Sequence, residues 1–304
     1  MDLRRGSEPL THRWTARGRE ILDGSRSLPA LMGIVNVTPD SFSDGGLAFD
    51  LPAAIARAEQ LAAEGADLID VGGESSRPGA RSISETEELR RVVPVIEALV
   101  DRLSLPISVD TTKLTVAREA IRAGAAILND IRALNHNVDL ASLISDTGAG
   151  IVLMHMNGEP AAMQQSPRYG DVVAEVRQFL ADRVDWAIAH GVARNAIAID
   201  PGIGFGKTIE HNLSLLQNLP ALADLDRPIL IGVSRKRFLG ELTGREVRDR
   251  LVPSVVAAVH AAARGAAVLR VHDVAATRDA LTVWAALEND QHLSEPSERS
   301  ASQP

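Results

Sequence analysis

The chain has 304 residues, of which 45% are hydrophobic, so it can bury a large core and is typical of a globular protein. Its 32 Lys and Arg residues are outnumbered by 40 Asp and Glu residues, and the formal net charge of -8 argues against nucleic acid as a partner. The sequence has no cysteine, which excludes disulfides, thiolate catalysis and cysteine-ligated metal sites and fits a cytoplasmic location.

The two ends of the chain differ in composition from the rest. Residues 1–28 include several arginines but no apolar run of the length that a secretory signal needs, so we expect an arm that enters the fold. Residues 289–304 are rich in Ser, Glu, Gln and Pro, and we expect a disordered tail. The sequence has no apolar stretch of about 18 residues, so no contact with a membrane is expected. A single domain is therefore expected over residues 29–288.

Short apolar runs rich in β-branched residues recur along this domain and predict strands. The runs are residues 31–37, 68–71, 107–109, 127–128, 151–154, 196–199, 229–233 and 268–271. Segments between them predict helices, such as residues 50–65, where Asp50 can cap the helix, Pro52 suits its first turn and Gly65 can end it. Residues 247–264 predict another helix. Eight strand–helix units with continuously hydrophobic strands predict an α/β fold, a TIM (β/α)8 barrel.

Polar and charged residues recur where the apolar runs end. They are Asn36, Asp70, Asp110, Asn129, Asp130, His155, Asp200, residues 234–236, Arg270 and His272. In a (β/α)8 barrel the C-terminal ends of the strands form the rim where active sites lie. One such residue would be explained equally well as the cap of the next helix. Their repetition along the chain instead predicts a site.

Residues 200–208, DPGIGFGKT, come close to two nucleotide-binding motifs without matching either. A P-loop would need glycine at Pro201, and a dinucleotide-binding fingerprint would need glycine at Lys207. The glycines that are present predict a tight loop that can approach a ligand closely.

Five segments together resemble the signature segments of the dihydropteroate synthases. They are MGIVNVTPDSFSDGG (32–46), DVGGESSRPGA (70–80), DPGIGFGKT (200–208), SRKRFLG (234–240) and RVHDV (270–274). The resemblance implies the same barrel fold. It also implies an enzyme that displaces diphosphate from (7,8-dihydropterin-6-yl)methyl diphosphate with the amine of p-aminobenzoate.

The resemblance implies a pterin pocket. A pterin presents an edge of amide and amine donors, and a carboxylate can accept two parallel hydrogen bonds from it, which is the role that Asp200 matches. Lys236 matches the donor to the acceptors of the pterin, and Phe205 resembles an apolar wall. The pterin-binding positions are Asp110, Asn129, Met154, Asp200, Phe205, Lys236 and Arg270.

The other positions that the resemblance implies bind diphosphate, metal and p-aminobenzoate. The diphosphate positions are Asn36, Ser75, Arg77, Arg270 and His272; the p-aminobenzoate positions are Ser76, Arg77, Pro78, Ser234 and Lys236; the catalytic positions are Arg77, Lys236, Arg270 and His272. Asn36 resembles a Mg²⁺ ligand, and its single amide oxygen suits a cation held mainly by water and phosphate. Residues 38–46 are expected to act as a lid. The resemblance also implies a homodimer, for which residues 253–263 are a candidate surface, although an ordinary core helix would explain this apolar segment equally well.

Two alternatives remain open at this stage. Lys236 at a strand end would suit a Schiff-base aldolase, but Asp110, Asn129 and Asp200 would then have no purpose. The second alternative is a pterin-binding paralogue without synthase activity, or a relative of the folate-binding domains of corrinoid methyltransferases. Those domains resemble the pterin positions but lack the SRK and RVHDV segments, so the presence of both segments favours a synthase.

Overall fold

The computed structural model describes residues 12–38, 50–75, 82–158, 163–164 and 167–288. The strands are β1 (Arg13–Ala16), β2 (Arg19–Asp23), β3 (Ala30–Asn36), β4 (Leu68–Gly72), β5 (Ile107–Asp110), β6 (Ile127–Asp130), β7 (Gly150–Met154), β8 (Ile197–Asp200), β9 (Leu230–Ile231) and β10 (Val268–Val271). The α-helices are α2 (Leu51–Ala63), α3 (Glu85–Arg102), α4 (Leu114–Arg122), α5 (Val138–Thr147), α6 (Val172–Ala189), α7 (Ile209–Gln217), α8 (Arg237–Thr243), α9 (Leu251–Ala262) and α10 (Val274–Glu288). Short 3-10 helices are η1 (Arg194–Ala196), η2 (Leu219–Leu225) and η3 (Val247–Asp249).

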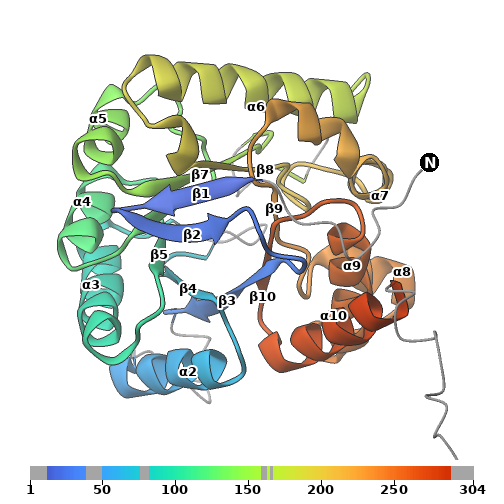
Figure 1. Ribbon diagram of the computed structural model, residues 1–304, viewed down its shortest axis with the longest axis horizontal. Coiled ribbons are helices and arrows are strands. Elements are labelled where there is room, and N and C mark those ends of the chain that lie inside the picture. Colours follow the sequence, from blue (N-terminus) through green and yellow to red (C-terminus); the bar gives the residue numbers. More distant parts are fainter. Residues whose placement is uncertain (1–11, 39–49, 76–81, 159–162, 165–166, 289–304) are drawn as a thin grey trace, which may run out of the picture.

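Strands β3 to β10 form one parallel sheet that curls into a barrel surrounded by helices (Figure 1). Their order is β8-β7-β6-β5-β4-β3-β10-β9. The two edges approach each other through a parallel bridge between Ile199 and Ile229, where Ile199 N donates to Pro228 O at 2.9 Å. The predicted (β/α)8 barrel is confirmed, and each strand begins and ends within about two residues of its predicted bounds.

The hairpin of β1 and β2 lies across one end of the barrel, and the sequence did not predict it (Figure 1). Trp14 is fully buried there, and its Nε1 donates to Ala196 O at 2.9 Å. Ala16 and Leu22 pack in the same cluster as Met32 and Leu68, which lie in β3 and β4. This end is the N-terminal end of the strands, so the hairpin closes the barrel opposite the predicted site. Residues 1–11 of the predicted arm and the predicted tail, 289–304, lie outside the described residues.

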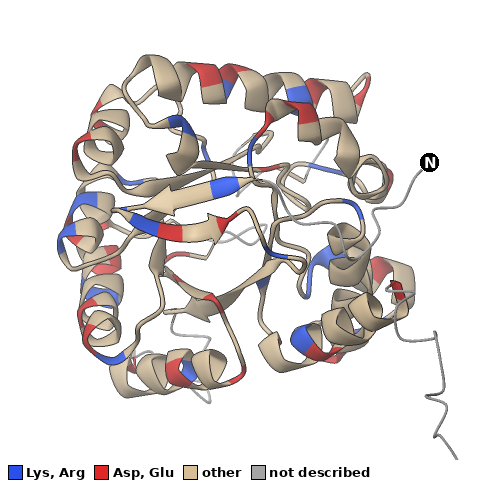
Figure 2. Cartoon of the chain, in the orientation of Figure 1, with Lys and Arg blue, Asp and Glu red and all other residues tan. Residues whose placement is uncertain are grey.

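Helix α2 has the cap that the sequence predicted, because the side chain of Asp50 accepts from Ala53 N. The helix predicted over residues 247–264 is interrupted: η3 ends at Asp249, and α9 begins only at Leu251. A continuous helix would place the ring of Pro253 against the carbonyl group of Asp249, whereas the interruption puts Pro253 in the first turn of α9. Acidic and basic residues alternate along outer helices such as α3 and α6 (Figure 2). Within the described parts of the chain, no helix is long and apolar enough to span a bilayer.

Candidate active site

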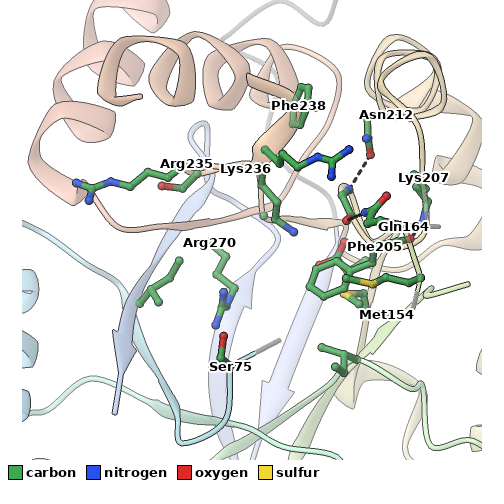
Figure 3. A pocket seen from close by; sticks show the side chains of 18 of the residues that line it. Ser75, Met154, Gln164, Phe205, Lys207, Asn212, Arg235, Lys236, Phe238 and Arg270 are labelled. Atoms are coloured by element: carbon green, nitrogen blue, oxygen red, sulfur yellow. Dashed lines mark hydrogen bonds between the residues drawn. The ribbon is translucent and has the colours of Figure 1, made fainter. Parts of the chain in front are cut away.

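The C-terminal ends of the barrel strands surround a cavity of about 690 Å³. Among the residues that line it are Asn36, Ser75, Asp110, Asn129, Met154, Asp200, Phe205, Ser234, Lys236, Arg270 and His272. The strand register explains why they meet, since Asp110 is paired with Asn129 across β5 and β6, and Met154 with Asp200 across β7 and β8. Figure 3 shows Phe205 and Met154 on one side of the cavity and Arg270 on the other. The predicted site positions that the structure describes are therefore brought together.

Two carboxylates, those of Asp70 and Asp110, hold Arg270 and Asn129 on the floor of the cavity. Arg270 Nε donates to Asp70 Oδ2 at 2.6 Å, and Arg270 Nη2 donates to Asp110 Oδ2 at 3.0 Å. Asn129 Nδ2 also donates to Asp70 Oδ2, at 3.1 Å. Because Asp70 is fully buried, this shared oxygen fixes the orientation of both neighbours.

The charges of this floor are balanced against burial. Burial raises the pKa of Asp110 to about 7, although the positive charge of Arg270 opposes the rise. Burial acts to lower the pKa of Arg270, but the carboxylates of Asp70 and Asp110 outweigh it and leave that pKa above its usual value. Arg270 therefore stays charged, while burial disfavours the charged form of Asp110.

Asp200 presents a carboxylate from the end of β8. It is 6% exposed, and its Oδ1 accepts from Gly202 N at 2.7 Å. Burial raises the pKa of Asp200, and the bond from Gly202 and the charge of Lys236 act in the opposite direction. The second oxygen is left to accept hydrogen bonds from a donor edge in the cavity.

Lys236 precedes α8 and extends over the cavity. Its Nζ donates to Ile203 O at 2.5 Å and lies 4.0 Å from the centroid of the Phe205 ring, a cation–π contact. Burial lowers the pKa of Lys236 to about 7, and the carboxylate of Asp200 partly offsets the change. The amine is thus held beside both the apolar wall and the acidic floor.

The mouth of the cavity contains a second polar pair. Ser234 Oγ and His272 Nδ1 lie 3.0 Å apart, and His272 N donates to Ser234 Oγ at 3.2 Å. Arg57 Nη2 donates to His272 O at 2.5 Å and so supports the backbone of the same segment. Arg235 points away from the cavity (Figure 3), toward Asp273, with which it forms an ion pair of 2.5 Å. Of Arg235 and Lys236, Lys236 is therefore the one aimed at the cavity.

The chain is similar in sequence and in fold to several known proteins. The family described as pterin binding enzyme matches residues 32–272. The dihydropteroate synthase of Escherichia coli is 46% identical over 257 residues, covering 84% of this chain and 91% of that protein. The solved dihydropteroate synthase of Xanthomonas albilineans with 4-aminobenzoic acid is 49% identical, covers 94% of this chain and 100% of that one, and superposes with a TM-score of 0.84. The chain belongs to the dihydropteroate synthase family. A Yersinia pestis dihydropteroate synthase solved with a sulfonamide drug superposes equally well, with a TM-score of 0.84 at 45% identity.

Membership in the dihydropteroate synthases leaves the Schiff-base aldolase without support. The lowered pKa of Lys236 alone would be compatible with a Schiff base, but Asp110, Asn129 and Asp200 surround the same cavity. Ser76, Arg77 and Pro78, and residues 39–46 of the expected lid, lie outside the described residues.

The roles of two residues of the site were not predicted from the sequence. Asp70 was noted among the strand-end polar residues, but its bonds to Arg270 and Asn129 were not predicted. Lys207 was considered only as the residue that breaks a nucleotide motif, yet it is 3% exposed and closely bound inside the loop after β8. Residues two apart in a strand lie on the same face, so the spacing of Asp70 and Gly72 was the available signal that Asp70 faces inward. The sequence contains no comparable signal for Lys207.

Proposed function

We propose that the chain joins (7,8-dihydropterin-6-yl)methyl diphosphate to p-aminobenzoate, giving 7,8-dihydropteroate and diphosphate in folate biosynthesis in the cytoplasm. The observation that carries this proposal is a single cavity. It has carboxylate and amide groups on its floor, a lysine on its wall and basic side chains at its mouth. A dihydropteroate synthase of Xanthomonas albilineans has been solved with 7,8-dihydropteroate, and it superposes on this chain with a TM-score of 0.80.

The pterin binds on the floor in this proposal. Its amide and amine edge donates to Asp200, and its ring packs against Phe205 and Met154. Asp110 and Asn129 complete the polar edge, and Lys236 donates to the acceptors of the ring. Arg270 contacts both the pterin and the diphosphate, since two of its donor nitrogens are occupied by Asp70 and Asp110 and a third remains.

Diphosphate binds at the mouth, next to Arg270 and His272, with Ser75, Arg77 and Asn36 completing the set. The described residues contain no group of three His, Cys, Asp or Glu side chains that could hold a metal. Asn36 lines the cavity and offers one amide oxygen, which fits Mg²⁺ held mainly by water and substrate phosphates. When bound, Mg²⁺ would stabilise the negative charge of the departing diphosphate.

p-Aminobenzoate binds above the pterin, against Ser76, Arg77, Pro78, Ser234 and Lys236. The bond between the pterin methylene carbon and the diphosphate oxygen breaks first, and the amine of p-aminobenzoate then attacks the resulting pterin-methyl cation and releases a proton. Arg77, Lys236, Arg270 and His272 act electrostatically on this step, since charge moves onto the leaving group as the bond breaks. The pair of Ser234 and His272 keeps the mouth in a fixed shape while this happens.

A homodimer is part of the proposal. Helix α9 leaves Val252 and Val256 exposed, at 70% and 64%, and the neighbouring α10 leaves Val283 and Leu287 exposed, at 59% and 79%. Apolar side chains gathered on adjacent helices are typical of a surface that a partner covers. A second copy of this chain is the proposed partner, and sedimentation equilibrium measures the association directly.

The reaction is tested by incubating the purified protein with both substrates and following dihydropteroate. Formation of dihydropteroate that stops when Mg²⁺ is chelated, and resumes when Mg²⁺ is restored, is the expected result. Tight pterin binding without any dihydropteroate would instead support the alternative, a pterin-binding paralogue without synthase activity.

A further inference from the structure

The loop after β8 is held against the segment after β7, with no space for a side chain at two positions of the loop. Gly202 and Gly206 have φ values of 67° and 61°, in the left-handed region that favours glycine. A Cβ added at Gly202 would lie 1.9 Å from the carbonyl oxygen of His155, and one added at Gly206 would lie 2.2 Å from that of Asn157. The position of the loop therefore depends on close backbone contacts, and the loop carries Phe205 into the cavity (Figure 3).

Lys207 lies within this loop, where its side chain is 3% exposed. Its Nζ donates to Gly202 O at 2.9 Å and to Phe205 O at 3.0 Å, and it lies 2.9 Å from His155 Nδ1. The carbonyl oxygen of His155, at 3.5 Å, is a longer fourth contact. An ammonium group has three donors and no acceptor, so the three close acceptors match the three N–H groups of a protonated Lys207. Burial lowers the pKa of Lys207 to about 7, and the carboxylate of Asp200 acts in the opposite direction.

His155 fits this arrangement as a neutral ring. Burial, together with the positive charge of Lys207, lowers the pKa of His155 to about 3. A neutral imidazole can offer a lone pair on Nδ1 to the ammonium group. His155 N also donates to Asp200 O at 2.9 Å, so the ring that Lys207 contacts belongs to a residue bonded to the backbone of Asp200.

Other side chains serve other parts of the loop. Gln164 Nε2 donates to Gly204 O at 2.6 Å, Tyr169 Oη donates to Gly206 O at 3.0 Å, and Asn212 Oδ1 accepts from Gly204 N at 2.7 Å. Lys207 is distinct because it joins the first turn of the loop, at Gly202, to the carbonyl group of Phe205. With its three donors occupied, Lys207 has none left for a ligand.

We propose that Lys207 is a positioning residue whose ammonium group holds the loop after β8 in the shape that presents Asp200 and Phe205 to the pterin. The inference rests on the proposed function, because it concerns the same pterin pocket. It gives the two buried lysines of the site different tasks: Lys236 contacts the pterin, and Lys207 acts on it only through the loop.

The first test is the variant Lys207→Met, which keeps most of the apolar stem and removes all three donors. Pterin affinity, measured by calorimetry at a temperature where circular dichroism shows a folded protein, is expected to fall roughly tenfold to a hundredfold. Binding of inorganic diphosphate with Mg²⁺ is expected to be unchanged, since Lys207 does not contact Arg270 or His272. A lower melting temperature with unchanged pterin affinity would overturn the proposal, because that is the result for a purely structural lysine.

Chemical rescue separates the donors from the space that the side chain fills. In Lys207→Ala, n-propylammonium has the same length as the missing part of the side chain, and we expect it to restore pterin affinity. Tetramethylammonium carries the same charge without an N–H donor and is expected to have no effect. Equal effects of the two cations, or no effect of either on a folded variant, would count against the proposal.

Two control variants make the outcomes distinguishable. Arg227 is also a buried cation that donates to a backbone carbonyl, that of Arg194 at 2.5 Å, but it precedes β9 at the opposite end of the barrel. Arg227→Met is expected to lower stability without changing pterin affinity. Normal pterin binding in Lys207→Met together with weak binding in Asp200→Asn would overturn only the role of Lys207. Normal binding in both variants would overturn the proposed pterin site itself.

Discussion

Replacing Asp200 by Asn changes one carboxylate oxygen into an NH₂ group at a buried position. Asp200 Oδ1 already accepts from Gly202 N at 2.7 Å. The amide can keep this bond only by turning its NH₂ group toward the cavity, where the proposed pterin edge also presents donors. If the amide flips, its NH₂ group faces the N–H of Gly202 instead. In both orientations the NH₂ group faces another hydrogen-bond donor, and in both the negative charge of the carboxylate is lost.

The expected loss follows from the number of bonds involved. A hydrogen bond to a charged group contributes about 1.5–3 kcal/mol, so losing two weakens binding by about 3 kcal/mol or more. With 1.4 kcal/mol for each factor of ten, pterin affinity should fall about a hundredfold or more. Calorimetry with the pterin measures this directly. Near-normal affinity in a folded Asp200→Asn protein would refute the reasoning and remove Asp200 from the site.

Asp130 provides a matched control for the same substitution. It is 1% exposed at the end of β6, and its oxygens accept from Arg132 N at 2.9 Å and Leu134 N at 2.6 Å. These bonds hold a turn and do not face the cavity. Asp130→Asn should therefore lower the free energy of unfolding, by about 1–3 kcal/mol for one opposed donor, and leave pterin affinity unchanged.

Three further predictions concern the other parts of the site. p-Aminobenzoate should bind more tightly in the presence of diphosphate and Mg²⁺ than alone, as measured by calorimetry; equal affinities would contradict the proposed ordering of residues 38–46 and 75–82. Arg270→Ala should lower turnover at saturating substrates by more than it weakens binding of a pterin without diphosphate, whereas full turnover would show that the RVHDV segment has another role. Burial lowers the pKa of His155 to about 3 from its usual 6.5. Between these two pH values the unfolded chain binds more protons than the folded protein, so the free energy of unfolding decreases as the pH is lowered. Lowering the pH from 6.5 to 5 should reduce the free energy of unfolding by about 2 kcal/mol, as measured by urea titration. This reduction should be absent in His155→Gln, which keeps an acceptor for Lys207. The same reduction in both proteins would exclude His155 as the cause.

The barrel could be predicted because its strands are buried on both faces and therefore read as apolar runs. The hairpin of β1 and β2 could not, because its strands of four and five residues contain charged residues such as Arg19 and Glu20, with only Trp14 and a few others turned inward. The break before α9 depends on the position of Pro253 relative to the preceding turn. A hydrophobic pattern alone does not determine where a helix with a proline near its start begins.

The membership of the site could largely be predicted, since parallel strands bring their C-terminal ends together whatever the residues between them. Which of these groups bind one another could not be predicted. The sharing of Asp70 Oδ2 between Arg270 and Asn129 depends on β4, β6 and β10 facing one another across the barrel. Likewise, a lysine such as Lys207 in a glycine-rich loop is indistinguishable from a solvated one until the loop is folded. Local sequence contains the residue types, but the tertiary structure decides their partners.

The most direct test of the proposed reaction is release of diphosphate from (7,8-dihydropterin-6-yl)methyl diphosphate, followed with and without p-aminobenzoate and Mg²⁺. With both present, one diphosphate should appear for each dihydropteroate formed, and omission of either p-aminobenzoate or Mg²⁺ should remove most of the signal. A protein that binds the pterin diphosphate in this cavity but releases no diphosphate under any of these conditions would contradict the assignment of the site as that of a working synthase.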